Sequence, residues 1–186
     1  MKKVVAKTAQ ELTSHFDPIN EESVELLKPD YNPDQYLKEL MDHELYEDSI
    51  VFLAHGLPKR EAIWWACVCV RSQTDDNTKA DDLASLQVAE KWVYDPDEKN
   101  RRLCGTLAEK GEYKSAHNWT AAAVFWSGGS ITNEKDPAVE PAPYLYAHAV
   151  TGAILTAVGM GDSDNIEDKF KTFIQKGINI ADGGNG

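Results

Sequence analysis

Apolar residues recur at helical spacing along most of the chain, and two stretches show this most clearly. The first follows Asn32 and Pro33, which have the pattern of an N-cap and a first-turn proline. Its apolar positions are Tyr36, Leu37, Leu40, Met41 and Leu45. One stripe of this kind predicts an amphipathic helix that buries a single face. The second stretch, Ala62 to Val70, is apolar on nearly every side, which predicts a helix enclosed by several others.

The second stretch organises the expected fold. Its helix is expected to run from Pro58 to about Gln73, and the chain enters it through a corner at Leu57 and Pro58. Thr78 is expected to cap the following helix. The last helix is expected over about residues 165–174.

No part of the sequence shows the alternating pattern of a β-strand, and the hairpin turn dipeptides Asn-Gly and Asp-Gly are absent before the C-terminal tail. We therefore expect one all-α domain over residues 1–186, with about eight or nine helices. Residues 1–30 are expected to form a loosely attached arm, and residues 181–186 a flexible tail. The tryptophans of successive helices are Trp64, Trp92, and Trp119 or Trp126. Their recurrence leaves stacked helical hairpins open as an arrangement, although no repeat consensus is present.

Acidic residues outnumber basic ones by 31 to 19, which gives the chain a formal net charge of −12. A field of this sign repels phosphate backbones, so nucleic acid is not an expected ligand. It also disfavours anionic membrane surfaces. Residues 141–161 carry no charge over the length of a membrane span. Interior glycines, His148 and the lack of flanking positive charge favour a buried helix there instead, and no membrane span is expected.

The three cysteines do not form a disulfide framework, because Cys67 and Cys69 lie two positions apart on one helix and Cys104 stands alone. With no apolar secretion segment after the basic N-terminus, the cytoplasm is the expected location. The cysteine spacing is also wrong for a zinc site, so no metal or cofactor is expected. Cys104 as a nucleophile would need a histidine such as His117 or His148, and the spacing gives no support.

Two glycine-bearing segments share composition with ligand loops. Ser127 to Ser130 has the composition of a phosphate cradle, but it follows a helix instead of preceding one, so helix termination is the preferred interpretation. Residues 161–165 resemble half of a calcium loop, yet Ile166 falls at the fifth position and the required glycine is missing. No catalytic residue is expected in either segment.

The corner contains the most unusual charges in the sequence. Lys59 and Arg60 are cations at a helix N-terminus, where they oppose the helix dipole, whereas Glu61 suits that position. One interpretation pairs Arg60 with a carboxylate inside the fold. The other makes the corner, with His55, a docking site for an anion or an acidic partner. In this second interpretation, Arg101 and Arg102 are expected to lie near the corner. The same two interpretations apply to the block containing Trp126, Ser127 and Ser130, which is either a partner-binding surface or a packed helix end.

Four blocks of sequence carry a family resemblance: FLAHGLPKREAIWWA at 52–66, RRL at 101–103, FWSGGS at 125–130 and PAPYLYAHAV at 141–150. Over about residues 50–160 the chain resembles an uncharacterised family of bacterial helical proteins that share FLA-x-x-LP-x-RE-x-x-WWA and FWSGGS blocks. The resemblance implies no activity and no catalytic residue. It associates the chain with the neighbourhoods of secretion systems, type VI in particular.

The leading functional hypothesis is a non-enzymatic helical protein-interaction module, serving as an adaptor, chaperone or accessory factor of a larger bacterial machine. Tryptophan and arginine, the residue types of its characteristic blocks, are favoured at interface centres. The first alternative is an enzyme. The pocket that it requires would be lined by His55, Arg60, Glu61 and His148. The second alternative is an immunity or antitoxin protein, because an acidic surface suits a basic toxin.

Overall fold

The computed structural model describes residues 1–133, 135–161 and 165–186, and these residues form ten α-helices and no β-strand. The helices are α1 (Ala9–Thr13), α2 (Glu21–Leu26), α3 (Pro33–Asp42), α4 (Tyr46–Gly56), α5 (Lys59–Arg71), α6 (Ala80–Tyr94), α7 (Glu98–Lys110), α8 (Ala116–Phe125), α9 (Leu145–Val158) and α10 (Ile166–Ala181). The expected all-α class is confirmed. The described helices number slightly more than the expected eight or nine, and the two shortest, α1 and α2, have 5 and 6 residues.

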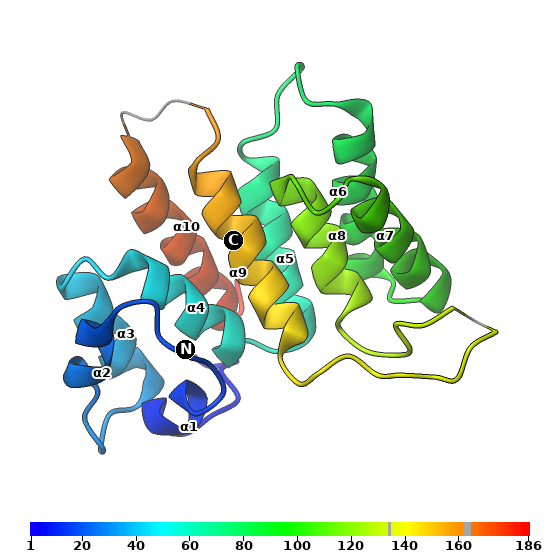
Figure 1. Ribbon diagram of the computed structural model, residues 1–186. Coiled ribbons are helices and arrows are strands. Elements are labelled where there is room, and N and C mark those ends of the chain that lie inside the picture. Colours follow the sequence, from blue (N-terminus) through cyan, green and yellow to red (C-terminus); the bar gives the residue numbers. More distant parts are fainter. Residues whose placement is uncertain (134, 162–164) are drawn as a thin grey trace.

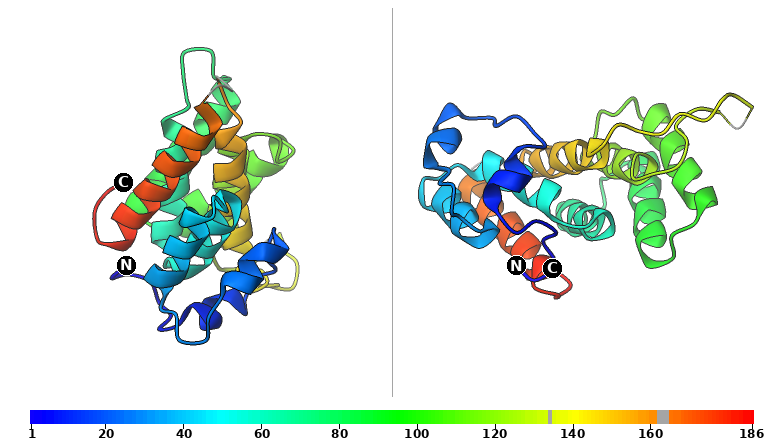
Figure 2. Two further views of the ribbon diagram at one scale, coloured as in Figure 1. Left: turned by 90° about the vertical axis from the view of Figure 1, so that its left-hand side faces the viewer. Right: turned by 90° about the horizontal axis from the view of Figure 1, so that it is seen from below.

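Helix α9 lies in the middle of the molecule (Figure 1). It packs against α8 and α5 on one side and against α4 on the other. Helices α1–α3 gather at one end of the molecule, and α6–α8 gather at the opposite end (Figure 2). Because α9 contacts helices that precede it by long stretches of sequence, the fold is not a simple stack of successive hairpins.

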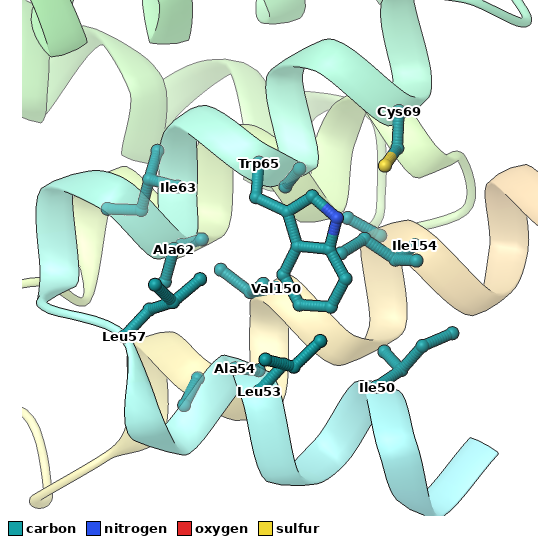
Figure 3. Packing of buried hydrophobic residues seen from close by; sticks show 14 of the residues in the cluster. Ile50, Leu53, Ala54, Leu57, Ala62, Ile63, Trp65, Cys69, Val150 and Ile154 are labelled. Carbon is teal, nitrogen blue, oxygen red and sulfur yellow. The ribbon is translucent and has the colours of Figure 1, made fainter. Parts of the chain in front are cut away.

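Trp65 of α5 forms the buried centre of the fold (Figure 3). Its fully buried indole lies beside Leu53 of α4 and Val150 of α9. Its Nε1 donates a hydrogen bond to the carbonyl of Phe173 in α10, with a donor–acceptor distance of 2.7 Å. Helix α5 therefore has neighbours on several sides, as its apolar pattern predicts.

Helix α10 extends seven residues beyond its expected end near Ile174 and stops at Ala181. The extension includes Gly177, a residue that weakens a helix by about 1 kcal/mol relative to alanine. A β-carbon at this position would lie 2.8 Å from Cε2 of Trp65, so only glycine lets the two helices approach this closely. Burial of Ile180 on the same helix favours the extension.

The N-cap predicted from the sequence is confirmed at α3 and is wrong at α6. Asn32 and Gln35 form a capping box, in which each side chain accepts a hydrogen bond from the other's backbone N–H at 3.0 Å. Thr78 does not cap α6. Its hydroxyl accepts a hydrogen bond from the backbone N–H of Asp75, and Lys79 is the N-cap without a side-chain hydrogen bond.

The N-terminal residues are packed against the body of the protein, contrary to the expected loose arm. The backbone N–H of Lys3 donates to the carbonyl of Ala181 at 2.8 Å, and Leu12 is only 2% exposed. The buried carboxylate of Asp48 accepts a hydrogen bond from the backbone N–H of Ile19 at 2.8 Å. A hydrophobic contact at α1 and a satisfied buried carboxylate both fix this segment.

The C-terminal tail also makes specific contacts. The indole N–H of Trp64 donates to the carbonyl of Asn185 at 2.9 Å. The backbone N–H of Gly186 donates to the side-chain oxygen of Asn179 at 2.9 Å. The expected flexible tail is therefore hydrogen-bonded to α5 and to α10.

Across the described parts of the chain, no helix combines the length and the hydropathy that crossing a membrane requires. The charge-free segment of the sequence forms the 14-residue α9 instead. Its small residues allow close contact with α8: a β-carbon at Gly152 would lie 3.3 Å from the indole of Trp119.

Candidate interaction surface

The cations of the α4–α5 corner bind the carbonyl groups of neighbouring helices. The Lys59 ammonium donates to the carbonyl of Ser127 at 2.8 Å, just beyond the end of α8. The Arg60 guanidinium donates from Nε to the carbonyl of Val93 at 2.5 Å and from Nη2 to that of Tyr94 at 3.3 Å, at the end of α6. The last carbonyls of a helix lack partners within it and carry partial negative charge. The cations oppose the dipole of their own helix but complement the dipoles of two others.

The expectation that Arg60 pairs with a carboxylate is therefore wrong, because its partners are backbone carbonyls. Sequence patterns miss such partners because every residue type has a carbonyl group. Glu61 instead forms an ion pair with Lys3 from the N-terminal segment, at 3.3 Å.

Arg101 of α7 also holds the segment that follows α8. The residue is only 4% exposed, and its guanidinium donates to the carbonyls of Phe125 at 2.7 Å and Ser130 at 2.9 Å. It also binds both carboxylate oxygens of Glu98, at 2.6 and 2.7 Å. Hydrogen bonds from Arg101, and then from Arg102, lower the pKa of Glu98 to about 2. The carboxylate is thus charged throughout the physiological range and orients both arginines.

The glycine-rich block, Ser127 to Ser130, has a backbone conformation that lets it lie close to the Arg101 side chain. Gly129 has a φ of +66°, and a β-carbon there would lie 3.0 Å from Nη2 of Arg101. Arg102 adds a hydrogen bond to the carbonyl of Thr132. The block ends α8, as expected, and three cations fix it: Lys59, Arg101 and Arg102. Arg60 binds elsewhere, at the end of α6.

Trp126, the C-cap residue of α8, borders two hollows in the protein surface. The proline hollow has a volume of about 460 Å³. The residues that border it include Lys59, Trp126, Glu140, Pro141, Pro143 and Tyr146. The α7–α8 hollow has a volume of about 410 Å³. The residues that border it include Arg102, Glu109, Tyr113, Phe125 and Trp126.

Three aromatic rings pack together at this position. Trp126 stacks on Tyr113 with 5.7 Å between ring centroids and an interplanar angle of 17°, and its centroid lies 6.3 Å from that of Trp119. All three side chains are partly exposed. Glu112 and Tyr113 both have positive φ, at 54° and 55°. Two successive non-glycine residues in this region are uncommon and strained. We call these three rings and the two hollows the Trp126 surface.

His55 occupies a different environment from Arg60 and Glu61. Its ring is fully buried, with Nδ1 2.8 Å from the carbonyl oxygen of Val51 and a centroid 5.0 Å from that of His148. Nε2 has no hydrogen-bond partner among the described residues. Burial lowers the pKa of His55 to about 4, so the imidazole is neutral near pH 7. With Nδ1–H donating to Val51, Nε2 carries the lone pair.

The enzyme hypothesis placed four residues in one pocket, but in the structure they do not share a hollow. Arg60 and Glu61 border a hollow of about 340 Å³ with Trp64 and Tyr94, whereas His55 borders the proline hollow. His148 is exposed and borders neither of these two hollows.

The thiols lie in the core. Burial raises the pKa of all three cysteines, that of Cys104 to about 12, so they are protonated near neutral pH. His117, considered as a partner for Cys104, has its Nε2 3.1 Å from the hydroxyl of Thr74. Within residues 1–133, 135–161 and 165–186 no three His, Cys, Asp or Glu side chains are placed to hold a metal ion. Most of the calcium-like segment 161–165 lies outside the described residues.

Comparison with protein-family models matches the chain to the family of unknown function DUF6931 over residues 36–181. The chain belongs to this family. The DUF6931 match begins within α3 and ends with the last residue of α10, so it includes both the α4–α5 corner and the Trp126 surface. Helices α1 and α2 lie outside it. No curated protein and no solved structure matches the chain.

Proposed function

We propose that the chain is a non-enzymatic protein-interaction module, an adaptor or accessory factor of a larger bacterial machine, and that it docks its partner on the Trp126 surface. The observation that carries this proposal is the partly exposed cluster of Tyr113, Trp119 and Trp126, in which Trp126 borders both hollows and Tyr113 borders the α7–α8 hollow. Aromatic side chains are enriched in the centres of protein interfaces because they bury large areas at low conformational cost.

The surface is held rigidly from behind. Lys59 and Arg101 bind backbone carbonyls on both sides of Trp126, and α8 ends at this residue. Trp119 is fixed by close packing against Gly152 of α9. A surface ordered before binding loses less entropy when a partner docks. We therefore assign positioning roles to Lys59 and Arg101, and a contact role to Trp126.

The bacterial machine remains part of the proposal. It is supported by the resemblance of the WWA and FWSGGS blocks to proteins found near secretion systems. Type VI secretion components are the first candidates for the partner.

The proposal is tested by site-specific photocrosslinking in the native host. A photoreactive amino acid at Thr106, an exposed residue of the α7–α8 hollow, is expected to give a discrete adduct with one protein. The adduct should disappear when Trp126→Ala is added. The matched control carries the same group at Gln87, an exposed position on α6 that borders neither hollow, and should give no such adduct. An adduct pattern that is unchanged by Trp126→Ala would contradict the proposal.

The net charge of −12 favours one second candidate, an immunity or antitoxin protein that neutralises a basic toxin. Co-expression with neighbouring genes distinguishes the two. Rescue from a toxic neighbour is expected only for the second candidate.

A further inference from the structure

We propose that the Trp126 surface binds a proline-rich, basic segment of its partner in the extended polyproline conformation. This inference rests on the proposed function, since it specifies the chemistry of the partner that docks there.

The first argument concerns hydrogen-bond donors. Trp64 and Trp65 both donate their indole N–H to backbone carbonyls. Trp119 and Trp126 have no hydrogen-bond partner for theirs among the described residues, and neither does the hydroxyl of Tyr113; none of these three atoms is fully buried. The indole N–H is a donor only. The surface therefore offers donors to a ligand that supplies acceptors.

A polyproline segment meets this requirement. It has no internal hydrogen bonds, so its backbone carbonyls are free to accept, and proline contributes no competing N–H. Its rings pack against aromatic side chains in grooves, which is how several peptide-recognition domains bind such segments. The stacked pair Tyr113 and Trp126 and the indole of Trp119 provide these aromatic faces.

The chain itself places prolines beside the same tryptophan. Pro141 and Pro143 border the proline hollow together with Trp126 and Tyr146. This part of the surface is therefore already a site where prolyl and aromatic rings gather. The α7–α8 hollow, on the other side of Trp126, contains no proline of the chain among its bordering residues.

Charge selects a basic ligand. Glu109 borders the α7–α8 hollow and Glu140 borders the proline hollow; both are exposed and neither has an ion-pair partner among the described residues. The nearby cations have partners within the chain: Lys59 donates to a carbonyl, and Arg102 donates to a carbonyl and pairs with Glu98. The chain as a whole carries a formal net charge of −12. An acidic or phosphorylated segment would meet two carboxylates, whereas arginines flanking the prolines would complement them.

The test uses the full chain and a synthetic acetylated peptide of repeated Arg-Pro-Pro units. Binding is followed through the indole N–H resonances of the protein in heteronuclear NMR spectra. We expect the Trp119 and Trp126 signals to shift and the Trp65 signal to stay unchanged. Peptides of Arg-Ala-Ala and Glu-Pro-Pro units separate the contributions of proline and of charge, and both should bind at least about tenfold more weakly.

Two kinds of protein variant complete the test. Trp126→Ala should weaken binding by about tenfold or more, and Trp126→Phe, which keeps a ring but removes the N–H, should have a smaller effect. The double variant Glu109→Gln, Glu140→Gln changes only exposed side chains and is expected to fold normally. It should bind the peptide more weakly, and its binding should depend less on salt concentration. Tyr94→Ala, 73% exposed on α6 and outside both hollows, is the matched control and should bind normally.

The inference is overturned if the Arg-Pro-Pro peptide does not bind, if Arg-Ala-Ala binds equally well, or if the shifts centre on Trp64. These outcomes are separable from failure of the proposed function. A Trp126-dependent crosslink from Thr106 without peptide binding leaves a docking surface for another chemistry. Loss of both signals removes the docking surface itself.

Discussion

The Lys59 ammonium donates a hydrogen bond to the carbonyl oxygen of Ser127 at 2.8 Å. This contact joins the two blocks of sequence that stand out most, the α4–α5 corner and the glycine-rich end of α8. Its donor and acceptor are 68 residues apart. The corner thus has a structural role, and its effect on function passes through the position of Trp126.

Replacing Lys59 tests this connection. Lys59→Met keeps the aliphatic stem but removes the donor, and we expect the free energy of unfolding to fall by about 1 kcal/mol. Urea denaturation followed by tryptophan fluorescence measures the change. Lys38→Met is the matched control, because Lys38 is exposed and its ion pair is with Asp42 on its own helix; its denaturation midpoint should not change. Equal effects of the two variants would contradict the role given to Lys59.

Arg101→Met should be more severe. The buried guanidinium satisfies the carbonyls of Phe125 and Ser130 and pairs with Glu98. Its loss removes the Arg101 donor from both carbonyls and leaves Glu98 paired with Arg102 alone, so we expect a decrease of about 2 to 4 kcal/mol in the free energy of unfolding. Arg101→Lys should recover only part, because an ammonium cannot reproduce the planar fork. Arg102→Met, at a more exposed position, should cost less. If the free energy of unfolding of Arg101→Met equalled that of the unsubstituted protein, contacts other than those of Arg101 would hold the segment from Phe125 to Ser130.

Gly177→Ala is expected to destabilise the protein despite the higher helix propensity of alanine. The new β-carbon would lie 2.8 Å from Trp65, and overpacking of this kind costs about 1 to 3 kcal/mol. Thermal unfolding followed by circular dichroism gives the comparison. Gly159→Ala is the control: its nearest contact is the carbonyl of Thr156 at 3.5 Å and its φ is −75°, so it should be neutral or slightly stabilising. A stable Gly177→Ala protein would mean that Trp65 can move.

His55 predicts how stability depends on pH. Burial lowers its pKa from 6.5 to about 4, against the opposing effect of its hydrogen bond to the carbonyl of Val51. Between these pH values the unfolded chain binds a proton that the folded chain does not. The free energy of unfolding should therefore be fully retained above about pH 6.5 and fall by about 3 kcal/mol towards pH 4.

The variant His55→Gln cannot be protonated, and its stability should depend less on pH over the same interval. Some dependence should remain, because burial also lowers the pKa of His117. Chemical denaturation at a series of pH values measures both slopes. An unchanged slope in His55→Gln would show that another group causes the acid sensitivity.

The sequence predicts helices more reliably than it predicts partners. The apolar stripe of α3 and its capping box are local, and they appear in the structure as expected. The length of α10 is not local: it depends on Gly177 meeting Trp65, more than a hundred residues away. Thr78 has the chemistry of an N-cap, but the Asp75 turn uses its hydroxyl instead.

The candidate site shows the same limit. Sequence reasoning singled out Trp126, Ser127 and the basic residues, and most of these lie together. It could not separate Arg60 from Lys59, because adjacent residues on a helix point in different directions. It missed Tyr113 and Trp119, since neither has a sequence signal distinct from a core aromatic. Their unpaired donors become visible only when every hydrogen bond is assigned.

The hydrogen bond between Lys3 and Ala181 has a practical consequence for protein engineering. Because the two ends of the chain lie side by side (Figure 2), a short linker joining them would close the polypeptide into a ring without bending a helix. New termini opened between Pro137 and Val139, in the long connection between α8 and α9, would interrupt none of the ten helices described. Such a circular permutant would present its new ends next to Glu140, which borders the proline hollow together with Trp126.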